Sequence, residues 1–217
     1  FWNVYTLVGR GMKQADAVKA VFASMKGIGI NAAHRNAVLA MCPFIGDEDL
    51  PTVAKAECHL THYHSMSAAA AVAVNIICRA AIRGLTLEEG VKRALASKLV
   101  SAHEKLVSAL LPPDPKKGKH KPLSKGGFAP DVVEAALHFV RKGGSFREAV
   151  LDSIQFAGGD NYCPVLVGAI AGAIHGASAV ENNELLKHCT RKLQTRVEAA
   201  SRALAESWSK TKEQKRC

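Results

Sequence analysis

The stretch FAGGDNYCPVLVGAIAGAIHG, residues 156–176, places two glycines, an acid and an amide directly before the most apolar segment of the chain. Glycine allows positive φ and lets the backbone approach a ligand closely. The free N–H groups at a helix start attract negative charge or phosphate. Because Pro164 suits the first turn of a helix, we predict a turn at 158–161 and a helix over 162–176. A plainer alternative stays open, in which Asp160 only caps that helix.

The predicted helix carries a glycine at every fourth position, at Gly168, Gly172 and Gly176. Each glycine inside a helix costs about 1 kcal/mol relative to alanine. Such a cost needs a packing reason, and the spacing predicts a neighbouring helix that approaches this face closely. That contact would hold the turn rigidly, as a binding site requires.

Helix signals recur along the rest of the chain, and no alternating strand pattern of useful length is present. Thr86–Glu89 and Ser145–Glu148 have the pattern of capping boxes, and Pro51 and Pro130 suit first turns. Residues 30–46 read as irregular or partly helical. We therefore expect one all-α domain over 1–217 with short connections. The expected helices are 12–26, 51–62, 65–83, 86–111, 130–142, 145–156, 162–176 and 183–208.

The composition limits the class of protein. Apolar residues make up 48% and aromatic residues 6% of the 217 residues, which favours small side chains between closely packed helices. The longest apolar run, 66–82, is interrupted by Ser67, Asn75 and Arg79, so no membrane span is expected. The six cysteines form no C-x-x-C pair, which excludes zinc ribbons and favours reduced thiols in an intracellular, cytoplasmic protein.

Much of the net charge of +10 lies in two segments. Residues 112–125 hold five lysines against one acid, and 206–217 hold four basic residues against two acids. We interpret 112–126 as a flexible basic insertion that aids solubility. Attraction for an anionic substrate stays open. Nucleic-acid binding is disfavoured because no aromatic residues alternate with the lysines.

Three stretches resemble the ADP-ribosylglycohydrolase family, in the family's order. GGDNYCPVLVGAIAGAIHG is similar to its Gly-Gly-Asp-x-Asp-[Thr/Ser] loop and the helix that follows. Residues 54–84 resemble its Thr-His motif with an Ala-rich helix, and 126–160 resemble the segment leading into the acidic loop. The resemblance covers about residues 30–180. It implies a compact, orthogonal multi-helix domain that hydrolyses ADP-ribosyl glycosidic bonds with Mg²⁺, as a monomer whose partner is ADP-ribose or an ADP-ribosylated protein.

The resemblance also assigns residues to roles. Asp160 and Asn161 are the expected metal ligands. His62, Gly126, Gly127, Phe128, Gly158 and Gly159 are the expected substrate-binding residues. The catalytic residue stays unassigned. Structural alternatives remain for His62, as a core histidine, and for 126–128, as a turn that closes the insertion.

The chain departs from the family pattern at two places. Tyr162 stands where the second acid of the loop belongs, and Cys163 stands where the hydroxyl belongs; phenol and thiol are poor Mg²⁺ ligands. The family's N-terminal Thr-Asp-Asp motif has no counterpart here. Because the chain begins with Phe1, we expect its N-terminal portion to be missing. The alternative is a non-catalytic relative that binds ADP-ribose or serves a structural role, as the J1 crystallins of this family do.

Three other arrangements deserve testing. Cys58 and His62 share a helix face and lie near His59 and His64, yet tetrahedral zinc needs further ligands on that face. Cys163, at a helix start, could have a lowered pKa and act as a nucleophile. Arg35 could contact phosphate, although a surface arginine is the simpler interpretation.

Overall fold

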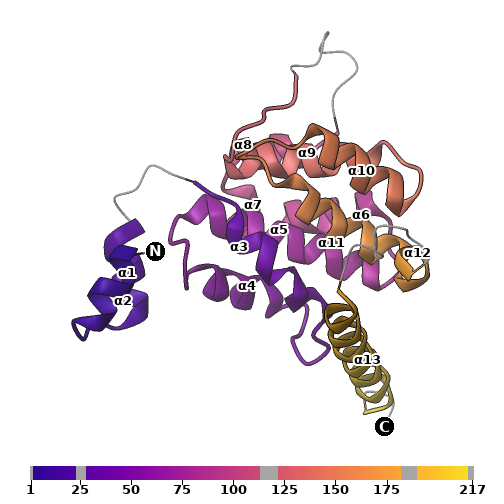
Figure 1. Cartoon of the computed structure of the whole chain (residues 1–217), viewed down its shortest axis with the longest axis horizontal. Coiled ribbons are helices and arrows are strands. Elements are labelled where there is room, and N and C mark those ends of the chain that lie inside the picture. The colour runs from indigo at the N-terminus through magenta and orange to yellow at the C-terminus, as the bar shows by residue number, and fades with distance from the viewer. Residues whose placement is uncertain (1, 23–27, 113–121, 182–189, 215–217) are drawn as a thin grey trace.

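The computed structural model describes residues 2–22, 28–112, 122–181 and 190–214, and within these ranges it is all-α, without strands (Figure 1). The predicted fold class is therefore confirmed. The helices are α1 (Trp2–Gly9), α2 (Gln14–Phe22), α3 (Asn31–Asn36), the 3-10 helix η1 (Ala37–Met41), α4 (Leu50–Cys58), α5 (Ser65–Ile82), α6 (Leu87–Ala96), α7 (Lys98–Ser101), α8 (Glu104–Leu110), α9 (Ala129–Arg141), α10 (Phe146–Phe156), α11 (Cys163–His175), α12 (Ala177–Glu181) and α13 (Arg191–Gln214).

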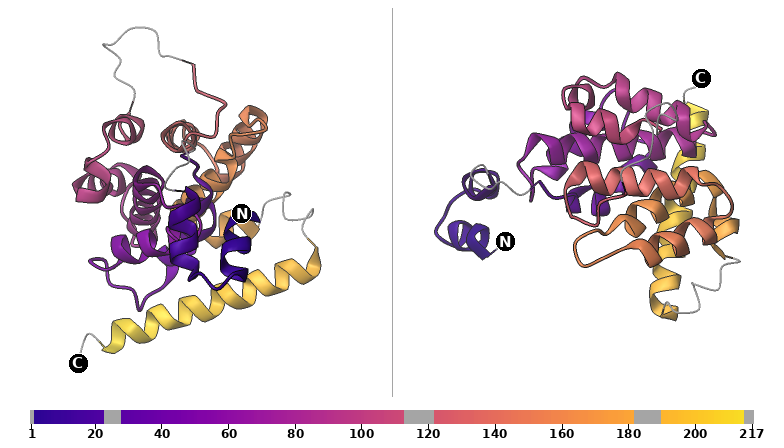
Figure 2. Two further views of the ribbon diagram at one scale, coloured as in Figure 1. Left: turned by 90° about the vertical axis from the view of Figure 1, so that its left-hand side faces the viewer. Right: turned by 90° about the horizontal axis from the view of Figure 1, so that it is seen from above.

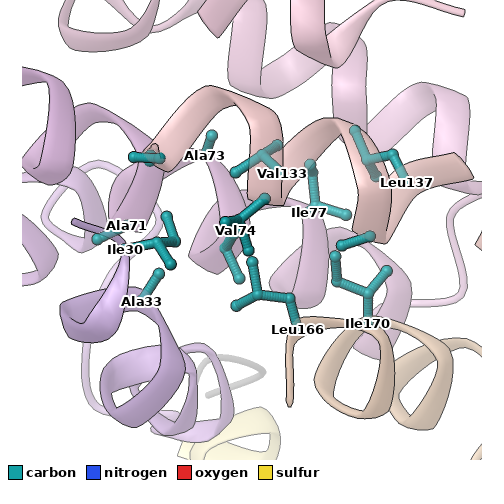
Figure 3. Close-up of a cluster of buried hydrophobic side chains, with 14 of the residues drawn as sticks. Ile30, Ala33, Ala71, Ala73, Val74, Ile77, Val133, Leu137, Leu166 and Ile170 are labelled. Carbon is teal, nitrogen blue, oxygen red and sulfur yellow. The ribbon is translucent and has the colours of Figure 1, made fainter. Parts of the chain in front are cut away.

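Helix α5 forms the centre of the fold. Its alanine-rich sequence leaves almost no exposed side chain, and α3, α4, α6, α9 and α11 all pack against it. Figure 3 shows Leu166 of α11 and Val133 of α9 lying beside Val74 of α5 in the buried core. Small side chains permit this because they let helix axes come close on several sides at once.

Several helix boundaries follow the sequence signals. Thr86 and Ser145 each form a capping box. Their side-chain oxygens accept from the backbone N–H of Glu89 and Glu148, and their own backbone N–H groups donate to the carboxylates of these glutamates. Pro51, Pro130 and Pro164 lie in the first turns of α4, α9 and α11. These predictions are confirmed because the signals act locally, within one turn of the residue that carries them.

The single helix predicted over 86–111 is wrong. Ser97 and His103 adopt extended backbone conformations and divide it into α6, α7 and α8. Neither residue is a glycine or proline, so neither of them signals a helix break. Because of these breaks, Val100 is buried in the core and α8 packs against α9. The stabilisation from this burial depends on tertiary packing, which overrides the local helix preference.

The glycine stripe also differs from its prediction. A Cβ on Gly168 would meet no described atom within 4 Å, and one on Gly172 would meet only the Phe146 ring at 3.8 Å. Gly176 has φ 77° and ends α11. The close helix approach lies instead at Gly90, where a Cβ would stand 3.3 Å from the Ile77 Cα of α5.

The two ends of the described chain lie outside this core. α1 and α2 pack on each other through Val4, Ala17 and Val18, with Tyr63 as the neighbouring side chain of the main body. The last helix, predicted over 183–208, is α13, and 182–189 lie outside the described residues. Figure 2 shows α13 as a long helix along one side of the body. The prediction of a flexible insertion falls mainly on 113–121, which are also outside the described residues.

One helix of the described ranges, α5, is long and apolar enough to cross a membrane by length and composition. Its span is 83% buried inside the protein, which is the pattern of a core helix.

Candidate functional site

The glycine-acid turn lies against the segment that ends the basic insertion. A Cβ on Gly127 would stand 3.0 Å from the Asp160 carbonyl oxygen, and one on Gly158 would stand 3.9 Å from the Lys125 Cβ. The first distance is shorter than nearly all real Cβ contacts, so glycine permits this approach of two backbones. The structure thus brings together 126–128 and 158–160, which are distant in sequence.

Asn161 ties the two segments together. Its side chain is fully buried; Nδ2 donates to the Ser124 carbonyl at 2.9 Å, and Oδ1 accepts from the Cys163 N–H at 3.0 Å. The N-cap position of α11 is Tyr162, and the first N–H of the helix, that of Cys163, is satisfied by the Asn161 side chain; the alternative in which Asp160 caps this helix is wrong. Asp160 is exposed, which leaves its carboxylate open to solvent or a ligand. Both polar groups of the Asn161 amide already have protein partners, and its role as a metal ligand stays a prediction.

Residues 28–29 form a third segment, which contacts the start of α9 and His62. The Ala129 N–H donates to the Ile28 carbonyl at 2.9 Å, which joins the start of α9 to residues 28–29. A Cβ on Gly29 would stand 3.4 Å from the His62 Nε2. His62 is partly buried, and its Nδ1 lies 2.9 Å from the Thr61 Oγ1. The predicted residue His62 thereby reaches the same region as 126–128.

His34 and Tyr162 complete the arrangement. Tyr162 directly follows the glycine-acid turn, is 52% exposed, and meets the His34 ring edge-on with centroids 6.3 Å apart. His34 of α3 is close enough to His62 for their charges to interact. Contacts thus link the glycine-acid turn to 126–128, the start of α9 to residues 28–29, and Gly29 to His62, and His34 adjoins the turn through Tyr162. We call residues 28–29, 34, 62, 126–128 and 158–162 the loop site.

The electrostatics of the loop site favour neutral imidazoles. Burial lowers the pKa of His34 to about 4, with the charge of His62 as a smaller cause. Burial also lowers the pKa of His62, and Arg35 adds to the effect while Glu57 opposes it. A neutral imidazole offers one donor and one acceptor nitrogen. The Nε2 of His34 is buried and has no hydrogen-bond partner among the described residues.

Arg35 is held by the neighbouring helix. Its Nε donates to the Glu57 Oε1 at 2.6 Å, and a terminal nitrogen donates to the Glu57 carbonyl at 3.1 Å. The pair joins α3 to α4 at the edge of the loop site. Contact between Arg35 and a phosphate stays untested.

Comparison with known proteins places the chain among relatives. A protein-family model described as ADP-ribosylglycohydrolase matches residues 4–214. The chain belongs to the ADP-ribosylglycohydrolase family. A solved structure titled "ADP-ribosylglycohydrolase-related protein complex" matches 94% of this chain and 78% of its own chain, with a TM-score of 0.70 and 20% identity. At that identity the match shows a shared fold. No curated protein matches the chain.

Family membership confirms the resemblance and extends it beyond residues 30–180. The sequence resemblance pointed to His62, 126–128 and 158–161, which the structure brings together. It missed His34, because this residue lies outside the three stretches that carry the resemblance. Tyr162 was noted only as a departure from the pattern, and its contact with His34 depends on the folding of α3 against α11.

The loop site of this family member does not offer the oxygen donors that Mg²⁺ prefers. Asp160 supplies an exposed carboxylate, but Tyr162 offers a phenol and Cys163 is a buried thiol. Among the described ranges, no group of three or more His, Cys, Asp or Glu side chains is placed to hold a metal. These residues do not fit a Mg²⁺ centre by themselves.

The zinc hypothesis finds no support in the described part of the chain. The His59 ring packs on Tyr63 with centroids 4.8 Å apart, and the His64 Nδ1 accepts from the Met66 N–H to cap α5. Burial raises the pKa of Cys58 to about 12, and its thiol donates to the His62 carbonyl. The four side chains therefore serve separate local contacts.

The Cys163 thiol is not activated as a nucleophile. Its side chain is fully buried, and burial raises its pKa to about 11 rather than lowering it. The thiol stays protonated near neutral pH and fills core space. The four cysteines of the described ranges are all free thiols, as expected for reduced cysteines.

Proposed function

We propose that this chain binds an ADP-ribosyl group at the loop site, and that this binding serves hydrolysis of an ADP-ribosyl glycosidic bond. The observation that carries the proposal is the series of contacts that links 158–160 to 126–128, the start of α9 to residues 28–29, and Gly29 to His62. The family resemblance assigned His62, 126–128 and 158–159 to substrate binding, and it assigned Asp160 to the metal. Exposed backbone at the glycine-acid turn, before the start of α11, suits a ligand that carries a diphosphate.

The chain's own residues have distinct tasks in this proposal. Gly127 lets the two backbone segments approach each other. His62, neutral at pH 7, offers a hydrogen bond to a phosphate or ribose oxygen. Asp160 presents the carboxylate of the site. No step is assigned to Mg²⁺, which would need oxygen ligands beyond those of the described residues. Monomeric state and cytoplasmic location stay predictions.

Gly127→Ala tests the binding site. The added Cβ would meet the backbone oxygen of Asp160 at 3.0 Å and push the two segments apart. We expect ADP-ribose affinity, measured by isothermal titration calorimetry, to fall about 10-fold, a cost of about 1.4 kcal/mol. Gly168→Ala is the matched control, because its Cβ meets no described atom within 4 Å. Equal affinity of both variants and the parent would show that the ligand binds elsewhere.

Hydrolysis is measured separately, as release of ADP-ribose from an ADP-ribosylated protein with Mg²⁺ present. If Asp160 takes part in the reaction, Asp160→Asn should lower the rate at least 100-fold while ADP-ribose affinity changes little. The second candidate function is a non-catalytic ADP-ribose-binding protein. It is favoured by Tyr162 and Cys163, which replace oxygen ligands, and it predicts binding without release of ADP-ribose.

A further inference from the structure

The strongest unexplained feature of the loop site is the pair formed by His34 and Tyr162. Neither residue belongs to the set assigned by resemblance, yet their edge-on contact joins α3 to the glycine-acid turn. Tyr162 is the large aromatic side chain at this turn, and about half of it is exposed. Its position next to Asp160 and Asn161 places it beside whatever the turn binds.

His34 contributes a polar atom without a hydrogen-bond partner in the described part of the chain. Its Nε2 is buried, and no described residue forms a hydrogen bond with it. Buried polar atoms usually have partners, since burial without one costs free energy. A ligand oxygen at the loop site would supply this partner. The neighbouring residue Arg35 binds Glu57 instead.

The side chains at the glycine-acid turn also suit direct contact with a nucleotide better than coordination of a metal. The loop offers one exposed carboxylate, Asp160, while the position of the second acid holds a phenol and the next position a buried thiol. A phenol and an imidazole bind nucleotides well by other means. Aromatic faces pack on purine or ribose rings, and both groups hydrogen-bond to ribose hydroxyls or phosphate oxygens.

We propose that His34 and Tyr162 contact the ADP-ribosyl group directly, His34 through a hydrogen bond at Nε2 and Tyr162 through packing of its exposed ring, and that this binding needs no divalent cation. The inference rests on the proposed function, because it takes the loop site as the ADP-ribose site. It goes further by assigning two recognition residues and by replacing cation-mediated contact with side-chain contact.

Calorimetric titration of the whole chain with ADP-ribose tests the inference, once in excess EDTA and once in Mg²⁺. We expect dissociation constants that agree within about twofold. In EDTA, Tyr162→Ala should weaken binding about 10-fold, because loss of one aromatic packing partner has an effect of this size. Tyr162→Phe should keep most of the affinity. His34→Gln should weaken binding about fivefold by changing the hydrogen-bonding group.

Two matched controls are available in the same chain. His59 also has a buried Nε2 without a partner among the described residues and a pKa lowered by burial, but it packs on Tyr63 outside the loop site. Tyr5 is an exposed tyrosine on α1. His59→Gln and Tyr5→Ala should leave ADP-ribose affinity unchanged. Thermal melts establish that each variant is folded. If His34→Gln does not fold, the result for Tyr162→Ala decides the test.

The outcomes separate the two proposals. Binding that appears only with Mg²⁺, or that Tyr162→Ala and His34→Gln leave unaltered, overturns the direct-contact inference while the proposed function stands. No ADP-ribose binding under either condition overturns the proposed function itself. Cation-independent binding that the loop-site variants weaken and the controls do not supports both.

Discussion

Helices α5 and α13 belong to the same chain and are held in opposite ways. Of the 18 residues of α5, 15 are buried, and α3, α4, η1, α6, α7, α8, α9 and α11 pack around it. The longer α13 has 24 residues, and none of its side chains described over 191–208 is fully buried. The difference teaches that one helix is placed by contact along its whole length and the other by a few anchoring side chains.

The two helices meet at one polar junction. Arg79 of α5 is buried, and its guanidinium donates to four backbone carbonyls and to Asp47. The Trp208 ring of α13 lies over that guanidinium at 5.2 Å, and its indole N–H donates to the Met41 carbonyl at 2.6 Å. The charge is tolerated in the core because every direction of its hydrogen bonding is used.

The largest effect is expected from Arg79→Ala. It removes a buried charge, leaves carbonyls of the η1 segment without donors and takes away the surface on which Trp208 rests. We expect a loss of about 3–5 kcal/mol in the free energy of unfolding, measured by urea denaturation. Arg83→Ala is the control; Arg83 also pairs with Asp47, but its side chain is 42% exposed, and the loss should stay below about 1 kcal/mol. Similar losses would contradict the anchoring role of Arg79.

A smaller effect is expected at the contact of α5 with α6. In the variant Gly90→Ala, the added Cβ would lie 3.3 Å from the Ile77 Cα and from the Ala80 Cβ. The two helices must therefore separate, which should lower the free energy of unfolding by about 1–3 kcal/mol. Gly168→Ala adds a Cβ in open space inside a helix and should stabilise by about 0.5–1 kcal/mol. Thermal melts of the two variants should therefore shift in opposite directions. A gain in stability from Gly90→Ala would show that the contact between α5 and α6 has room for the added methyl group.

Trp208→Ala should affect α13 more than the rest of the protein. Loss of the indole contact should lower the free energy of unfolding of the body by only about 1 kcal/mol, because α5 keeps its other neighbours. Limited proteolysis should cut α13 several-fold faster than in the parent. Val197→Ala, at a 56% exposed position of the same helix, should leave the cutting rate unchanged. Unchanged cutting of Trp208→Ala would show that other side chains hold α13.

The smallest effect concerns pH and belongs to the body of the protein. The pKa of His34 is about 4 in the folded protein against an ordinary 6.5, so the unfolded chain binds more protons between these values. Its contribution to stability is complete above pH 6.5 and is lost as pH falls toward 4. His34→Gln should reduce the pH slope of the unfolding free energy by less than about 1 kcal/mol per pH unit. The rate of α13 proteolysis should not share this dependence.

The site was only partly predictable from sequence. The motif order assigned His62, 126–128 and 158–161, and each of these positions belongs to the loop site. The sequence could not show that the side chain of Asn161, rather than that of Asp160, accepts from the first N–H of α11, because both side chains can accept a backbone N–H and the choice depends on where Ser124 lies. It also could not pair His34 with Tyr162, since residues 128 positions apart meet only through folding.

The sequence by itself determined the all-α class, the capping boxes at Thr86 and Ser145, the proline-led helix starts and the family. Each of these depends on neighbours within a turn or on a motif read in order. Only the tertiary structure decided the breaks at Ser97 and His103, the use of Gly90 in place of Gly168 for close approach, and the anchoring of α13 by Trp208. The physical reason is that these features arise from packing between distant segments, whose free energy exceeds the weak local preferences that a sequence displays.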